Sequence, residues 1–240
     1  MKAIILAAGR GSRMKDLTDG CPKCLVALRG KTLLDLQLEA LRAAGIDEIG
    51  IVTGYKSELL AGRGLDEFYN SRWAETNMVS SLACAESWLR AEPCIVSYSD
   101  IFYAPVAVQS LMNCTSALAV TYDPNWLELW TRRFGDPLLD AETFRLNASS
   151  ILKEIGNKPR SVEGIDGQYM GLLRMTPEGW EAIQKVRVNM GDIDRDQLQI
   201  TGVLQSIISQ NYLSVLAIPN SEPWGEVDSE ADLTVYCNQS

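Results

Sequence analysis

Two spacings of apolar residues alternate along the first half of the chain. Continuous apolar runs predict strands buried on both faces, and an apolar residue at every third or fourth position predicts a helix. Thr32 precedes one such helical run, which includes Leu34 and Leu38, and Gly45 is a suitable residue to end it. The predicted strands are 2–6, 47–55, 66–70, 93–100 and 116–123, and the predicted helices are 33–44, 56–61, 78–92 and 105–113. This order predicts an α/β fold with a mostly parallel central sheet and helices on both faces.

The pattern changes at Asp123 to a mixture of aromatic and charged residues. Two later segments read as antiparallel strands, which predicts a small antiparallel lobe inserted at 123–175 that closes over the site. The remaining predicted elements are strands at 149–156, 167–176 and 213–220, helices at 177–190 and 195–211, and a short strand and a terminal helix within 224–239. We therefore expect one domain over residues 1–240, with its core at 1–122 and 176–240.

Composition excludes several classes of function. Among the 240 residues no apolar stretch approaches the roughly 20 of a membrane span, and the N-terminus does not resemble a signal peptide. We therefore expect a cytoplasmic protein that has no membrane partner. The formal net charge of −9 argues against a nucleic-acid partner, because such binders usually carry a basic face.

The chain contains no histidine, which excludes Ser-His-Asp triads and histidine-ligated metals. Cys21 and Cys24 form a single C-x-x-C pair, which is not a complete zinc site. Without histidine, any reaction has to use carboxylates, lysine, arginine, hydroxyls or a bound metal. Reactions of this kind depend mainly on positioning and charge neutralisation. Phosphoryl and nucleotidyl transfer are reactions of that kind.

A loop with very small side chains follows the first strand. It reads Ala7-Ala8-Gly9-Arg10-Gly11-Ser12-Arg13, so a ligand can approach the backbone closely while the arginines attract negative charge. The loop is not a P-loop, because it lacks the Gly-Lys-Ser/Thr ending. It is not a dinucleotide fingerprint either, because Met14 occupies the place of the third glycine. The loop therefore predicts phosphate binding of another kind.

Three charged residues are candidates for binding phosphate or a metal ion beside this loop. Lys23 in "PKCLV" could direct its ammonium at phosphates held by the loop, or it could be an ordinary surface lysine before a strand. Asp100 and Asp228 follow strand-like runs and could hold Mg²⁺ against substrate phosphates. The alternatives are that Asp100 only turns the chain and that Asp228 caps the last helix.

Several motifs together carry a family resemblance. "AIILAAGRGSRM", "PKCLV", the aspartate after the fourth strand and "EVDSEADL" resemble nucleotidyltransferases of the sugar-phosphate type, which have a GT-A-like, Rossmann-like α/β fold. "ETNMVSSL", "YSDIFY" and the W-x-E-x-D-x-x-x-D-L spacing from Trp224 to Leu233 are similar to the CTP:phosphocholine cytidylyltransferase branch. "LWTRRFGDPLLDAETF" and "GQYMGLL" most resemble the CTP:phosphoglutamine cytidylyltransferases of capsule phosphoramidate synthesis.

The resemblance implies a Mg²⁺-dependent transfer of CMP from CTP to a small phosphorylated amine or amino acid, for cell-surface polysaccharide decoration. It implies that Lys23 and Arg13 bind phosphate and that Asp100 and Asp228 hold the metal. The implied nucleotide-binding residues are Leu6, Ala7, Ala8, Gly9, Gly11, Ser12, Arg13, Lys23, Thr76, Asn77 and Ser81. The expected partners are the nucleoside triphosphate and the acceptor, with a homodimer as the candidate assembly.

Two arrangements are open for the acceptor. Trp126, Trp130, Tyr169 and Trp224 could form an aromatic box for a quaternary amine, although core packing is the common role of such residues. The zwitterionic backbone of an amino acid could instead pair with the residues Arg132, Arg133, Asp140 and Glu142. We favour the second because of the "DAETF" resemblance, and we add Glu226 to the acceptor residues.

Two rival functions remain. One is a nucleotidyltransferase that uses a sugar 1-phosphate with UTP, dTTP or GTP. The other is a nucleotide-binding regulatory protein that has lost catalysis, against which the presence of Lys23, Asp100 and Asp228 argues.

Overall fold

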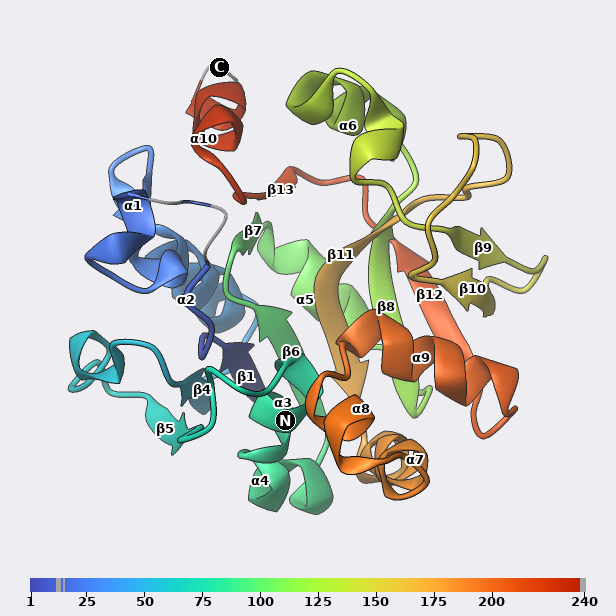
Figure 1. Cartoon of the computed structure of the whole chain (residues 1–240), viewed down its shortest axis with the longest axis horizontal. Helices are drawn as coiled ribbons and strands as arrows, with labels where there is room; N and C mark the ends of the chain where they lie inside the picture. Colours follow the sequence, from blue (N-terminus) through green and yellow to red (C-terminus); the bar gives the residue numbers. More distant parts are fainter. Residues whose placement is uncertain (12–13, 15, 238–240) are drawn as a thin grey trace.

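A seven-stranded sheet forms the centre of the computed structural model, which describes residues 1–11, 14 and 16–237. Its strand order is β12-β8-β11-β6-β1-β4-β5. Strand β11 is antiparallel to both of its neighbours, and the other adjacent pairs are parallel (Figure 1). The strands are β1 (Lys2–Leu6), β4 (Ile49–Thr53), β5 (Asp66–Tyr69), β6 (Cys94–Tyr98), β8 (Leu118–Asp123), β11 (Gln168–Met175) and β12 (Val215–Pro219). The predicted mostly parallel α/β fold is confirmed.

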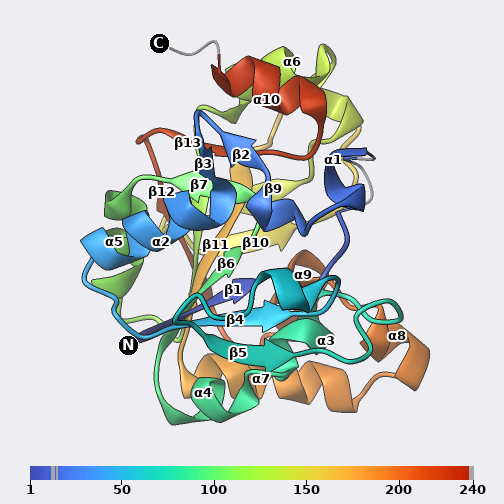
Figure 2. The same cartoon turned by 90° about the vertical axis from the view of Figure 1, so that its left-hand side faces the viewer.

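The continuous apolar sequence of β1 follows from burial on both faces of the sheet. Ile4 and Leu6 point into one hydrophobic cluster, whereas Ala3 and Ile5 point into another. The first cluster is covered by α3 (Met78–Ala83), α4 (Glu86–Ala91), α7 (Pro177–Val188) and α9 (Ile200–Ser209), and the second by α2 (Leu33–Ala43) and α5 (Pro105–Met112) (Figure 2). Helices therefore lie on both faces, as predicted.

Short elements surround this core. Three two-stranded pairs accompany the sheet: β2 (Ala27–Leu28) with β3 (Lys31–Thr32), β7 (Ile101–Tyr103) with β13 (Trp224–Glu226), and β9 (Phe144–Leu146) with β10 (Leu152–Ile155). The remaining helices are α1 (Asp16–Asp19), α6 (Trp126–Phe134), α8 (Asp192–Asp196) and α10 (Glu230–Cys237), with 3₁₀ turns η2 (Lys23–Leu25), η3 (Ser57–Leu59) and η4 (Pro137–Leu139). In the described part of the chain no helix combines the length and the apolar character needed to cross a bilayer.

Two predicted helices are each divided in the structure. The segment 78–92 forms α3 and α4, because Ala85 donates its amide hydrogen to Leu82 in a tighter turn between them. This break keeps both Leu82 and Leu89 packed in the hydrophobic cluster against the sheet. The segment 195–211 likewise lies in α8 and α9, which are separated by the residues 197–199.

The strand predicted at 167–176 is present, but it lies in the main sheet. Strand β11 pairs with β6 and β8, whereas the antiparallel hairpin in this region is β9 with β10. Leu172 and Leu173 are both fully buried, as expected for a central strand that is covered on both faces. Segment 126–134, for which the sequence pattern predicted no helix, forms α6.

Candidate active site

Three carboxylates meet where the chain leaves the carboxyl end of β6. Asp100 follows β6, whereas Glu226 and Asp228 come from β13 and the turn after it. The antiparallel pairing of β13 with β7 brings these distant segments together, and the Val227 amide donates a 2.9 Å hydrogen bond to the Asp100 carbonyl. One oxygen from each of the three carboxylates lies within 4.8 Å of the others. The two predicted acids are therefore together, and Glu226 is the third member.

Lys23 lies against this cluster rather than on the surface. Its ammonium donates to Asp100 Oδ2 at 2.7 Å and also to Asp228 Oδ1. Burial alone would lower the pKa of Lys23, but Asp100, Asp228 and Glu226 outweigh it and raise that pKa above its ordinary value. Lys23 is therefore a fixed positive charge at the site.

The glycine loop makes room for the Lys23 side chain. Gly11 has a φ of +68°, and a Cβ at this position would lie 2.9 Å from the Cβ of Lys23. A side chain here would be strained by the backbone and would also collide with the lysine. Gly11 therefore positions the ammonium as well as shaping the loop.

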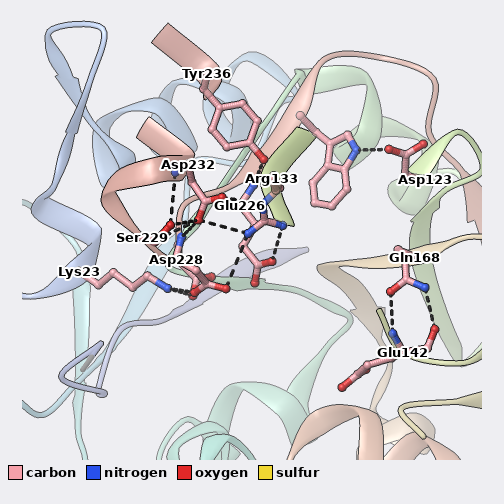
Figure 3. Close-up of polar contacts among 12 residues, drawn as sticks. Lys23, Asp123, Arg133, Glu142, Gln168, Glu226, Asp228, Ser229, Asp232 and Tyr236 are labelled. Atoms are coloured by element: carbon pink, nitrogen blue, oxygen red, sulfur yellow. Dashed lines mark hydrogen bonds and ion pairs between the residues drawn. The ribbon is translucent and has the colours of Figure 1, made fainter. Parts of the chain in front are cut away.

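Arg133 supports the acidic cluster through contacts with the carboxylates of Glu226 and Asp232 (Figure 3). Its side chain, on α6, has no exposed surface, and its Nε lies 2.8 Å from Asp232 Oδ1 while its NH1 lies 3.2 Å from Glu226 Oε2. Asp232 in turn accepts hydrogen bonds from the backbone amides of Asp228 and Ser229, at 2.9 Å each. Arg133 and Asp232 therefore hold the turn that presents Asp228.

The charges of this cluster fit a divalent cation. Among the described residues Asp100, Glu226, Asp228 and Asp232 supply four carboxylates, whereas Lys23 and Arg133 supply two positive charges. Two negative charges are left uncompensated when all four acids are ionised. Burial and then the repulsion from Asp228 and Asp100 raise the pKa of Glu226 to about 8. Asp100 Oδ1 is buried and accepts no hydrogen bond from the described residues, so it could bind a metal ion.

A cavity of about 450 Å³ lies on the glycine-loop side of the cluster. Eight predicted nucleotide-binding residues line it: Leu6, Ala8, Gly9, Gly11, Lys23, Thr76, Asn77 and Ser81. Ala7 does not line it, because Ala7 is 2% exposed and its amide is hydrogen-bonded to the Val52 carbonyl. Ser12 and Arg13 lie outside the described residues.

Two further residues of this region were not predicted from the sequence. The Asn70 amide nitrogen donates to the hydroxyl oxygens of Thr76 and Ser81, at 3.0 Å each, and so fixes both hydroxyls. Trp73 lines the cavity with its indole, which packs edge-on against Tyr55 at a centroid distance of 5.3 Å. Only a motif that included residues 70–73 could have indicated them.

A second cavity of about 350 Å³ lies on the other side of the cluster, and Asp100 lines both cavities. Five predicted acceptor residues line it: Trp130, Asp140, Glu142, Tyr169 and Glu226. With Asp100 and Asp228 the lining holds five carboxylates, and no lysine or arginine is among the described residues that line it. Burial, and after it Asp140, raises the pKa of Glu142. This second cavity is therefore suited to a positively charged group.

The two predicted acceptor arginines are placed differently. Arg133 is held by Glu226 and Asp232 behind the cavity, and Arg132 is exposed on α6. Neither lines the second cavity. Adjacent residues of one helix point in different directions, so a pair of arginines in sequence does not make a paired binding site.

Only two of the four residues of the predicted aromatic box line the second cavity. Trp126 and Trp224 pack on Trp130 at centroid distances of 6.2 and 6.1 Å, and neither lines the cavity. Trp224 also donates to Asp123 Oδ2 at 2.9 Å. Trp130 and Tyr169 do line the cavity. The Trp130 indole N–H and the Tyr169 hydroxyl are buried and have no hydrogen-bond partner in the described part of the chain. Both groups are therefore available to a polar ligand.

Comparisons with known proteins find a matching family model and several similar proteins. The family model described as a MobA-like NTP transferase domain matches residues 3–157. The protein named CTP:phosphoglutamine cytidylyltransferase of Campylobacter jejuni is 35% identical, over 98% of this chain and 98% of the relative. The choline-phosphate cytidylyltransferase of Streptococcus pneumoniae is 41% identical, over 92% of this chain and 100% of the relative. The solved inositol-1-phosphate CTP transferase from T. maritima has the same fold, with a TM-score of 0.76 at 18% identity over 99% of this chain and 96% of that one.

The buried position of Arg133 gives a stability prediction. We expect Arg133→Met to lower the free energy of unfolding by about 3–5 kcal/mol, because Asp232 would keep a buried charge without its cation and Glu226 would lose a hydrogen-bond donor. Arg132→Met, a change of the exposed neighbour, should alter it by less than about 0.5 kcal/mol. Urea unfolding followed by tryptophan fluorescence measures both. Equal effects of the two substitutions would contradict the supporting role of Arg133.

Proposed function

We propose that this chain, which belongs to the MobA-like NTP transferases and within them to the cytidylyltransferases, transfers CMP from CTP to a small phosphorylated amine or amino acid. The observation that carries the proposal is the position of the acidic cluster. Asp100 lines both cavities, so a nucleotide in one and an acceptor in the other would meet beside the three carboxylates. The use of the product for cell-surface polysaccharide decoration stays a prediction from the family resemblance.

The proposed reaction is an attack by a phosphate oxygen of the acceptor on the α-phosphorus of CTP. The new P–O bond forms there as the bond to the β-phosphate oxygen breaks, and pyrophosphate leaves with the electron pair. Because an acceptor phosphate is already ionised at neutral pH, no side chain has to remove a proton. This agrees with a chain that has no histidine.

The protein's part in this reaction is positioning and charge. Gly9 has open space around its Cα and lines the first cavity, so triphosphate oxygens could approach the loop backbone. Lys23 would supply a fixed positive charge beside the α-phosphate. Asp100, Glu226 and Asp228 would hold Mg²⁺, which when bound neutralises negative charge at the phosphates.

The second cavity supports an acceptor that carries an ammonium group. Five carboxylates line it, so a positive charge on the acceptor would offset the repulsion that its phosphate meets there. Phosphoglutamine and phosphocholine both satisfy this condition, one through an α-ammonium group and the other through a quaternary amine. The unpartnered Trp130 N–H and Tyr169 O–H could donate to an acceptor carboxylate, which phosphoglutamine has and phosphocholine lacks.

The decisive test is a pyrophosphate-release assay with Mg²⁺. We expect turnover with CTP and either phosphoglutamine or phosphocholine, and much less with UTP, dTTP or GTP. Reaction of a hexose 1-phosphate, with neither amine accepted, would place the chain with the sugar-phosphate enzymes. Binding of CTP without release of pyrophosphate for any acceptor would indicate a nucleotide-binding protein without catalysis.

Asp100→Asn should fold normally and lose about a hundredfold or more in turnover. The neutral amide removes one ligand of the proposed metal, and a loss of that size corresponds to a few kcal/mol of transition-state stabilisation. Asp47→Asn, a change of an exposed residue that lines neither cavity, serves as the control. Turnover numbers measured over a Mg²⁺ titration make the comparison. Near-wild-type turnover of Asp100→Asn would remove this residue from the site.

Glu142→Gln should raise the KM for the acceptor roughly ten- to a hundredfold, the cost of one charge-assisted hydrogen bond. The KM for CTP should change little, because Glu142 lines only the second of the two cavities. Glu163→Gln, on an exposed part of the same region, should leave both constants unchanged. If Trp130→Ala or Tyr169→Ala raises the acceptor KM while Glu142→Gln does not, then aromatic contacts rather than carboxylates select the acceptor.

A further inference from the structure

A third cavity, of about 540 Å³, lies away from the acidic cluster, beside α3, α7 and α8. This volume is within the usual range for sites that bind small molecules. The uncharged polar residues of its lining include Ser71, Thr76, Ser80 and Gln184, and Tyr69 and Cys84 are among the remaining residues. Nothing in the proposed transfer reaction uses this cavity.

Three arginines line this cavity, although the whole chain has a formal net charge of −9. They are Arg72, Arg187 and Arg195, and Asp196 is the one carboxylate among the described lining residues. Arg72 pairs with Asp196 at 2.6 Å and with Glu75 at 3.2 Å, and Arg195 pairs with Asp192 at 2.8 Å. Each guanidinium has five N–H donors, so these pairs leave donors available to a ligand.

Arg187 has the fewest partners of the three. Its NH1 donates to Gln184 Oε1 at 3.1 Å, and its Nε is buried without a hydrogen-bond partner. No ion pair is recorded for it among the described residues. Burial and the nearby charge of Arg195 lower its pKa, against a smaller opposing effect of Glu86 and Asp196. A negatively charged ligand, in addition to the Asp196 carboxylate, would therefore be favourable in this cavity.

Helix α3 separates this cavity from the proposed nucleotide cavity. Ser80 lines the arginine side, and its neighbour Ser81 lines the nucleotide side. Thr76, before the helix, lines both. The Asn77 amide also donates to the Asp196 carbonyl at 2.7 Å, which ties α8 to this wall. The two cavities are thus distinct spaces with one common wall.

We infer that this third cavity binds a small anion that carries at least two phosphoryl charges, either a free diphosphate or a nucleoside diphosphate. Three guanidiniums around one space match several phosphate oxygens, because each presents a planar fork of donors. The Ser71 hydroxyl adds a neutral donor on the same wall, whereas the hydroxyls of Thr76 and Ser80 already donate to the carbonyls of Arg72 and Arg195. The inference does not depend on which nucleotide or acceptor the active site uses.

Calorimetric titration with sodium pyrophosphate tests the inference. EDTA should be present, because the metal-free acidic cluster then repels the probe from the active site. We expect the wild-type protein to bind one more equivalent of pyrophosphate than the double variant Arg187→Gln, Arg195→Gln. Lys185→Gln removes a positive charge from the exposed face of the same α7 helix, so it should retain the wild-type stoichiometry.

A second variant tests the binding of this additional equivalent of pyrophosphate without the removal of an arginine. Cys84→Glu places a carboxylate at an exposed position of the lining and should abolish the extra equivalent. Circular dichroism melting confirms that each variant is folded. Titration with CDP distinguishes a nucleotide site from a site for free diphosphate, and orthophosphate should bind at least tenfold more weakly than pyrophosphate. Equal stoichiometry in the wild type and in the two folded variants would overturn the inference, as would orthophosphate binding as tightly as pyrophosphate.

Discussion

The ammonium of Lys23 between Asp100 and Asp228 is the interaction on which the candidate active site depends. It joins three segments that are far apart in sequence: the turn after the glycine loop, the end of β6 and the segment after β13. Each segment is shaped to allow this contact. Gly11 leaves space for the lysine, and the β7–β13 pairing sets Asp228 beside Asp100. Without the ammonium, two largely buried carboxylates would face each other with no positive charge between them.

A second layer of charge makes this arrangement stable without making it neutral. Arg133 compensates Glu226 and Asp232, and Asp232 in turn fixes the backbone at Asp228. The two positive charges do not balance the four carboxylates. When these acids are ionised, an excess of negative charge remains in one place, and a divalent cation would relieve it.

Sequence patterns predicted the parts of this protein that are local. Strand β1, the small-residue loop, Lys23 and the aspartate after β6 follow one another along the chain, so spacing and residue type were sufficient. The place of β11 in the main sheet was not predicted, because it depends on pairing with β6 and β8 rather than on its own pattern. Arg133 was assigned to the acceptor for the same reason. Its partners, Glu226 and Asp232, lie more than ninety positions away along the chain.

The distribution of charge over the three cavities adds a constraint on what can enter each. An acceptor phosphate has to approach a lining of five carboxylates, which is unfavourable unless the acceptor brings its own positive charge or a cation is already held at Asp100, Glu226 and Asp228. In the proposed reaction a nucleotide that arrives with its metal would supply that cation. That cation would also neutralise the excess negative charge of the cluster before the acceptor phosphate comes near. The arginine-lined cavity has three arginines and one carboxylate among its described lining residues, so an anion without a positive group would meet less repulsion there than in the acceptor cavity. The three cavities thus differ in the charge of the groups that line them, and this difference limits which ligands each could accept.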